Sequence, residues 1–156
     1  MIDAMRLNLS VIAIIFTLLT AAQAQAQGAC LNDRYDRTFF DTLKGTNFTP
    51  LESVSDNSLS LLLAECLGDP DLTLRDGIAY EGLAALLRQG RVSQAGIRRL
   101  FDKCAGFLHD EEDKGGFLHP FAALCLAEVA RTDRITPHFS DEERANFTTL
   151  ATDYLK

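Results

Sequence analysis

The sequence predicts an all-α fold of about six antiparallel helices. Apolar residues recur at the i, i+3, i+4, i+7 spacing of a helix face, and helix-capping residues, glycine and proline separate these stretches. No stretch alternates apolar and polar residues as a half-buried strand does. Short connections favour antiparallel neighbours, so we expect a HEAT-like stack of helical hairpins, or alternatively a closed helical bundle.

Residues 1–26 have the pattern of a secretory signal peptide. The apolar run at 7–20 is shorter than a membrane-spanning helix, and the alternating alanine and glutamine residues after it, typical of bacterial signals, offer cleavage sites after Ala24 or Ala26. The sequence therefore predicts a periplasmic or secreted protein. We expect a single mature domain at 27–156 and no membrane contact after cleavage.

The first two helices are expected before and after a loop that contains proline. The first covers 33–43 and ends at Gly45, and the second starts at a cap formed by Ser55 or Asp56 and ends at Gly68. The residues expected to face inward are Tyr35, Phe39, Leu43, Leu59, Leu62, Leu63, Cys66 and Leu67.

The third and fourth helices are also bounded by clear signals. The third begins after the Asp-Pro-Asp turn at 69–71 and runs to about Gln89, because Gly90 stops it. Ser93 caps the fourth. Its expected inward residues are Ile97, Leu100, Phe101, Cys104 and Leu108.

Two further helices are expected after an acidic loop. The fifth covers about 118–131, and Ser140 with Glu143 forms the capping box of the sixth. The expected inward residues are Phe121, Leu124, Cys125 and Val129 in the fifth, and Phe147, Leu150, Ala151, Tyr154 and Leu155 in the sixth.

A faint internal repeat favours the hairpin stack. The LLLAE sequence at 61–65 is similar to LCLAE at 124–128. The turn before the third helix also looks like part of a HEAT-type repeat. In such a unit, Arg75 is expected to reach a turn carboxylate, either Asp69 or Asp71.

Four cysteines, Cys30, Cys66, Cys104 and Cys125, remain after signal cleavage. An even number in an oxidising compartment indicates up to two disulfides, and their spacing does not match a thioredoxin centre or a zinc ribbon. Of the three possible pairings we favour Cys30–Cys66 with Cys104–Cys125. The last three are alternatively small core residues, and lipid attachment at Cys30 is a weaker alternative because no lipoprotein box precedes it.

Composition and charge describe an ordinary acidic globular domain. The chain has 156 residues, of which 47% are hydrophobic and 24% charged, which suits one domain. Fifteen basic against 22 acidic residues give a net charge of -7. Nucleic acid is therefore excluded as an expected partner, because a phosphate-binding surface needs the opposite sign.

Two stretches carry a family resemblance: CLGDPDLTLRDGIAYEGLAALL at 66–87 and FAALCLAEVARTDR at 121–134. Together they resemble the bacterial domain of unknown function 2785 family over 40–156. The resemblance implies a helical fold and brings no established reaction. Members of this family continue beyond the position that matches Lys156 into a segment with a Gly-Trp pair and histidines, so we expect this chain to be a shortened member.

Two groups of residues are candidate sites. The acidic loop places His109, Asp110 and His119 close in sequence as possible metal ligands, although the spacing fits no known motif and also suits a plain solvated loop. The second group, Arg75, Asp76 and Glu81, is a candidate binding site. Asp76 and Glu81 lie on different sides of a helix and so do not form an acid/base pair, whereas Arg75 also suits a purely structural ion pair.

The sequence favours a binding or interaction module of the bacterial cell envelope over an enzyme. Helix packing is its only strongly patterned feature, and no nucleophile elbow or phosphate-binding loop is present in the sequence. The expected partner is an unidentified protein or peptide, and no cofactor is predicted. The alternatives are a small metal-dependent hydrolase that uses the 109–119 loop, and an acidic inhibitor of a basic envelope enzyme.

Overall fold

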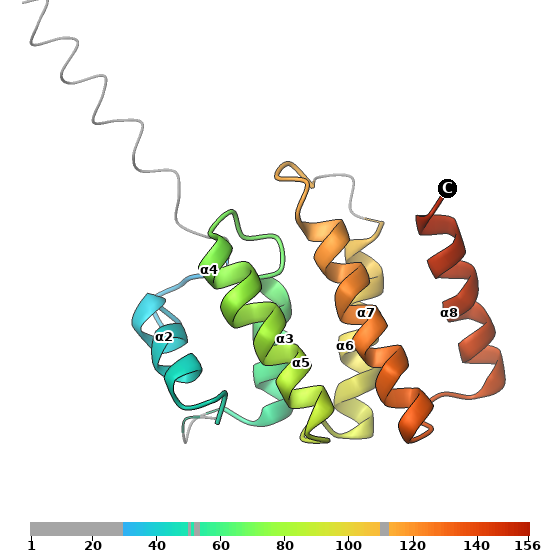
Figure 1. Ribbon diagram of the computed structural model, residues 1–156, viewed down its shortest axis with the longest axis horizontal. Coiled ribbons are helices and arrows are strands. Elements are labelled where there is room, and N and C mark those ends of the chain that lie inside the picture. Colours follow the sequence, from blue (N-terminus) through green and yellow to red (C-terminus); the bar gives the residue numbers. More distant parts are fainter. Residues whose placement is uncertain (1–29, 50, 52–53, 110–112) are drawn as a thin grey trace, which may run out of the picture.

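Six helices and no strands make up the described part of the chain, which confirms the predicted all-α fold (Figure 1). The structure is a computed structural model that describes residues 30–49, 51, 54–109 and 113–156. The predicted signal peptide at 1–26 lies outside this part. The helices are α2 (Arg37–Gly45), α3 (Asp56–Glu65), a third helix composed of α4 (Leu72–Leu74), η2 (Arg75–Tyr80) and α5 (Glu81–Arg88), then α6 (Gln94–Phe107), α7 (Leu118–Ile135) and α8 (Asp141–Tyr154).

Two helical hairpins lie side by side. The helix α3 packs against α5, and α6 packs against α7; between the hairpins, α3 contacts α6 and α5 contacts α7. In Figure 1, α5 and α7 form the front layer and α3 and α6 the back layer, with α2 at one end and α8 at the other. Each hairpin therefore covers the apolar face of its neighbour.

The predicted serine caps are confirmed. Ser55, Ser93 and Ser140 each precede a helix in extended backbone conformation and accept a hydrogen bond from an N–H of the first turn. At α8 the predicted capping box is complete, because the N–H of Ser140 also donates to Glu143 Oε2 at 2.6 Å. These caps fix where α3, α6 and α8 begin.

The first helix starts later than predicted. Asp36, rather than a residue before 33, is its N-cap and accepts from the N–H of Phe39 at 2.8 Å. The preceding residues form a turn in which the side chain of Asn32 accepts from the N–H groups of Arg34 and Tyr35. Phe40 is the fully buried phenylalanine of α2, whereas Phe39, which was predicted to face inward, is partly buried.

The third helix contains a π-helical segment, η2, that the sequence did not predict. One extra residue per turn is accommodated between α4 and α5, while the apolar face remains continuous through Leu74, Ile78 and Leu83, all buried. The buried residues are therefore four and then five positions apart, and a search for the constant period of an α-helix does not anticipate this shift.

The core runs through the centre of both hairpins. Its members from α3 and α6 agree with the sequence prediction, whereas Leu124 of α7 is 42% exposed and the prediction that it faces inward was wrong. Ala122 and Leu126 are buried in its place. Helix α7 packs on both α5 and α6, which shifts its buried face away from the stripe read from the sequence.

The internal similarity between 61–65 and 124–128 does not mark equivalent positions. The first segment belongs to α3 of the back layer and the second to α7 of the front layer (Figure 1). In the part of the chain described here, none of the helices has both the length and the apolar character needed to cross a membrane.

Candidate functional site

Arg75 is buried and acts as a connector between α7 and the turn before α4. Its side chain is 6% exposed, its Nη1 donates to the backbone carbonyl of Asp69 at 3.1 Å, and its Nε donates to the carboxylate of Asp76 at 2.6 Å. The prediction that Arg75 bonds to a carboxylate of the turn was therefore wrong, because Arg75 bonds to the backbone carbonyl of Asp69. The guanidinium also lies 4.0 Å from the ring centroid of Phe117 and 5.0 Å from that of Phe121.

The three predicted binding residues do not share one site. Asp76 pairs with the buried Arg75, whereas Glu81 pairs with Lys44 of α2 at 3.2 Å. The structure thus assigns each of them an intramolecular partner. A ligand-binding role for these residues stays a prediction.

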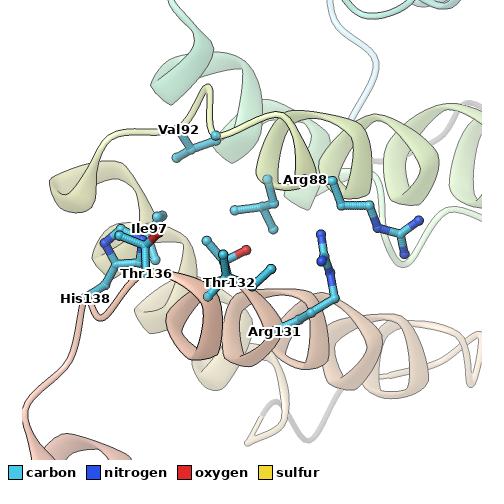
Figure 2. Close-up of a pocket in the computed structure, with 10 residues that line it drawn as sticks. Arg88, Val92, Ile97, Arg131, Thr132, Thr136 and His138 are labelled. Atoms are coloured by element: carbon cyan, nitrogen blue, oxygen red, sulfur yellow. The ribbon is translucent and has the colours of Figure 1, made fainter.

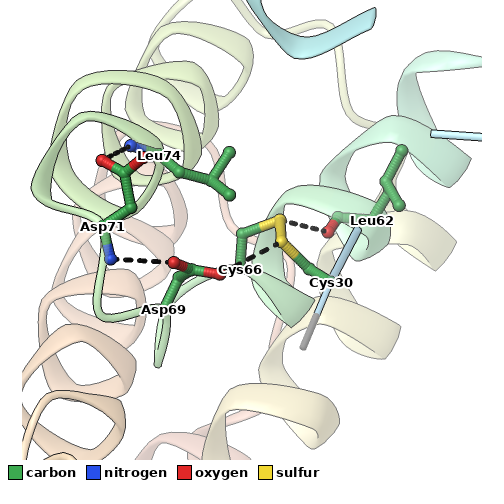
Figure 3. The surroundings of a disulfide bond; sticks show 6 residues. All are labelled: Cys30, Leu62, Cys66, Asp69, Asp71 and Leu74. Atoms are coloured by element: carbon green, nitrogen blue, oxygen red, sulfur yellow. Dashed lines mark hydrogen bonds between the residues drawn. A yellow bond between two sulfur atoms is a disulfide. The ribbon is translucent and has the colours of Figure 1, made fainter. Parts of the chain in front are cut away.

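The predicted Cys30–Cys66 disulfide is present (Figure 3). Cys66 is the C-terminal cap of α3, and Cys30 begins the described chain, so the bridge ties the N-terminal segment to the turn before α4. Both cysteines are buried, and the carboxylate of Asp69 lies 3.9 Å from Cys30 Sγ while accepting from the N–H of Asp71 at 2.8 Å. The bridge and this turn therefore form one unit.

The predicted metal loop is only partly described. Asp110 lies outside the described residues, whereas His109 and His119 are among them. Among described side chains, no group of three or more His, Cys, Asp or Glu residues is placed to hold a metal ion. The hydrolase alternative stays a prediction.

Asp113, at the end of this loop, caps α7 from outside the helix. Its carboxylate accepts from the N–H groups of Phe117, Leu118 and His119 at 3.0 to 3.2 Å. Partial burial would raise the pKa of Asp113, but these donors and the nearby His119 ring lower the pKa below its usual range. The carboxylate is therefore used to begin a helix.

A first cavity, the arginine pocket, lies between the end of α5 and the end of α7 (Figure 2). Its volume is about 210 Å³. Figure 2 shows the guanidinium groups of Arg88 and Arg131 at one end and His138 with Thr136 at the other. The lining residues are Leu87, Arg88, Gly90, Val92, Ile97, Arg131, Thr132, Ile135, Thr136 and His138.

Glu128 largely neutralises the arginine pocket. It is 7% exposed and accepts from Arg88 Nε at 3.0 Å and from Arg131 Nε at 3.1 Å. The hydrogen bonds from Arg88 lower the pKa of Glu128 most; burial opposes them and Arg131 adds to them. The two arginines therefore hold a buried carboxylate of their own chain. No local sequence pattern indicated this pairing, because Arg88 and Glu128 are 40 positions apart.

A second cavity, the α7–α8 groove, is almost entirely apolar. Its volume is about 340 Å³. The lining residues are Leu108, Ala123, Leu126, Ala127, Ala130, Phe147, Leu150, Ala151, Tyr154 and Leu155. The inward residues predicted for the last helix are all in this set, but none of them is buried, and Leu155 is 82% exposed. The apolar face of α8 thus borders an open groove.

Small residues of α7 keep the groove open. Ala123, Ala127 and Ala130 lie about one turn apart and form the floor, so no long side chain from α7 fills the space opposite α8. At Ala127 and Ala130 the groove joins a smaller cavity bordered by Arg131 and Arg134. The apolar groove thus adjoins Arg134 and Arg131, the latter already paired with Glu128.

Two charged clusters and a ring contact hold the N-terminal half of α8 in place. Arg98 of α6 donates to both carboxylate oxygens of Glu143 and to the carbonyl of His138. The ring of Phe147 lies 5.2 Å, centroid to centroid, from that of Phe101. Arg98, and next Ser140, lower the pKa of Glu143 to about 2.

Asp133 is the centre of the second cluster. Its carboxylate accepts from Arg144 Nε at 2.7 Å and from the N–H groups of His138 and Phe139 at 2.6 and 2.9 Å. The hydrogen bond from Arg144 is the main cause that lowers its pKa to about 2, against the opposing effect of burial. Asp133 therefore joins the end of α7, the connection and α8.

This geometry predicts that acid releases α8. Because the folded pKa of Asp133 lies below its unfolded value, the stabilisation is fully present above about pH 4 and is lost as the pH falls toward 2. The difference amounts to about 2 kcal/mol. We expect Asp133→Asn to lose this amount at pH 7 and to show a flatter dependence of the free energy of unfolding on pH between 4 and 2. Urea unfolding at each pH measures both effects.

Glu142→Gln serves as the control, since Glu142 is exposed on the same helix. It is expected to follow the wild-type curve. An Asp133→Asn curve that coincides with the wild type would contradict the role given to Asp133.

The fold and its cavities define a small helical domain with an apolar groove between α7 and α8. The chain matches none of the protein families, curated proteins or solved structures with which it was compared. Membership of the domain of unknown function 2785 family therefore stays a prediction.

Proposed function

We propose that this protein is an exported helical binding module of the bacterial cell envelope, and that it binds an apolar peptide segment of a partner protein in the α7–α8 groove. The observation that carries the proposal is the open apolar lining of this groove. Tyr154 and Leu155 are exposed and Leu150 is partly exposed, opposite a floor of alanines. An apolar partner that covers this surface removes it from water, which favours binding.

The shape of the groove favours a peptide. Its α8 side extends from Phe147 to Leu155, which is about 12 Å at a helical rise of 1.5 Å per residue. This length suits two turns of an amphipathic helix with anchors at i, i+3 or i+4, and i+7. Arg134, which lines the adjoining cavity, favours an acidic residue next to the apolar anchors.

Two other features agree with the proposal. The paired hairpins α3/α5 and α6/α7 fit a HEAT-like arrangement, in which stacked helices present an extended binding surface. The buried Cys30–Cys66 bridge suits a protein that folds in an oxidising compartment such as the periplasm. The HEAT-like arrangement, the export to an oxidising compartment and membership of the domain of unknown function 2785 family are all parts of this proposal.

A peptide library displayed on phage tests the proposal with the protein alone. Selected peptides are expected to share apolar residues at helical spacing with a neighbouring Asp or Glu. Ala127→Glu places a charge on the groove floor and is expected to weaken their binding at least tenfold, which isothermal titration measures. Ala145→Glu introduces the same change on an exposed position of α8 that does not line the groove, and is expected to bind as the wild type does.

Three results would overturn the proposal. Equal binding of the selected peptides to the wild type and to Ala127→Glu would place the site elsewhere. A wild-type dimer that Ala127→Glu converts to a monomer would identify a second copy as the occupant. Binding of phospholipid vesicles or fatty acid, without any selected peptide, would identify a lipid ligand. Matching thermal unfolding of both variants shows that the comparison is between folded proteins.

A further inference from the structure

The second cysteine pair lies at the centre of the α6–α7 contact. The predicted bridge between Cys104 of α6 and Cys125 of α7 is not formed in the structure, where both cysteines are free. Both are 0% exposed, and their Sγ atoms are 2.6 Å apart. This separation is shorter than a contact between two non-bonded sulfur atoms and longer than the bond of about 2.05 Å in a disulfide. Each thiol therefore already faces the atom to which it would bond.

We propose that Cys104 and Cys125 form a second disulfide, which closes during folding, before α6 and α7 bury it. The oxidant is a disulfide compound, such as oxidised glutathione or an oxidised dithiol catalyst. The thiolate of one cysteine attacks a sulfur of the oxidant and displaces one thiol, which leaves a mixed disulfide. The thiolate of the other cysteine then attacks the protein sulfur and displaces the second thiol. Two thiols of the protein are oxidised and one disulfide of the oxidant is reduced to two thiols.

The order of events follows from access and ionisation. Exchange needs a thiolate that an oxidant can reach, and neither sulfur is accessible once the helices have packed. The hydrogen bond with Cys104, followed by burial, raises the pKa of the Cys125 thiol well above its usual range. In the folded, reduced chain the Cys125 thiol is thus kept protonated and both sulfur atoms are shielded, and the same burial protects the bridge from reductants once it has formed.

The bridge fixes the helix that forms the floor of the groove. Cys125 lies on α7 next to Leu126 and Ala127, which line the α7–α8 groove. A covalent link at this position holds α7 against α6 while α8 borders its other side. The inference does not depend on the proposed ligand, and it is tested without one.

Refolding of the purified chain provides the test. The reduced protein is unfolded in urea and refolded with a mixture of oxidised and reduced glutathione. Remaining thiols are alkylated and the unreduced protein is digested with trypsin. Each cysteine falls in a different tryptic peptide, since Arg34, Lys44, Arg75, Lys103, Lys114 and Arg131 separate them. Mass spectrometry is expected to find the peptide 104–114 linked to 115–131, and the peptide of Cys30 linked to 45–75.

A second measurement tests the order of events. The chain is refolded with reductant only, transferred to oxidised glutathione, and sampled over time. Oxidation of Cys104 and Cys125 is expected to be at least tenfold slower in the folded protein than in urea. Alkylated Cys104 and Cys125 after oxidative refolding, or a link from either one to Cys30 or Cys66, would overturn the bridge. Equal oxidation rates in the folded and unfolded chains would overturn its closure before packing.

Discussion

Replacing Cys30 and Cys66 together with alanine is expected to lower the free energy of unfolding by about 4 kcal/mol at 25 °C. The bridge spans 36 positions, and closing a loop of this length removes conformational entropy from the unfolded chain, which gives an effect of this size. The native packing changes little, because alanine fits the space of each buried cysteine and loses only one sulfur atom. Urea unfolding of the oxidised wild type and the double variant measures the difference.

The single variants are the control for this prediction. Cys30→Ala alone and Cys66→Ala alone each abolish the same bridge, so each is expected to lose nearly as much as the double variant. Small losses that add up to that of the double variant would show that packing, and not the bridge, is responsible. A loss below about 1 kcal/mol in the double variant would also contradict the stabilising role of the bridge.

Arg75→Ala is expected to lower the free energy of unfolding by about 3 kcal/mol. The substitution removes two aromatic contacts of a desolvated guanidinium and leaves the carbonyl of Asp69 without this donor in a buried turn. Arg75→Lys retains the charge but loses the planar, forked donor, so we expect it to recover less than half of the loss. Thermal and urea unfolding measure both variants.

Arg99→Ala is the matched control for Arg75, since Arg99 is exposed on α6. It is expected to change the free energy of unfolding by less than about 0.5 kcal/mol. An Arg75→Ala variant that unfolds like the wild type but loses ligand binding would contradict the structural role and make Arg75 a recognition residue.

Local chemistry made much of the fold predictable. The first N–H groups of a helix have no partner inside the helix, and a serine placed before an apolar stretch accepts from one of them. Ser93 and the pair Ser140 and Glu143 therefore marked helix starts correctly. The Cys30–Cys66 pairing was also predicted, because these two cysteines are neighbours in the order of cysteines along the sequence.

Long-range packing explains what the sequence did not predict. The π-helical segment adds one residue to a turn of its helix, and the constant α-helical period used for the prediction does not describe such an insertion. Glu128 is buried on α7, and the arginine that pairs with it, Arg88, belongs to α5. No local pattern links two residues so far apart in sequence.

In the candidate site too, local sequence predicted one part and long-range packing decided the other. The apolar stripe of the last helix was predicted from its spacing, and Phe147, Leu150 and Tyr154 do share one face. Periodicity shows which face of a helix is apolar, but not whether another element fills the space opposite. Alanines in α7 leave this space open, and only the arrangement of the two helices shows it.

The most direct measurement locates a bound peptide on the protein. The methyl groups of alanine and leucine are labelled with ¹³C, and their NMR signals are followed while a peptide from the display selection is added. The proposed function predicts that the largest shifts fall on Ala123, Ala127, Ala130, Leu150 and Leu155. Shifts centred instead on Leu87, beside the arginine pocket, or an absence of shifts at saturating peptide, would contradict binding in the α7–α8 groove.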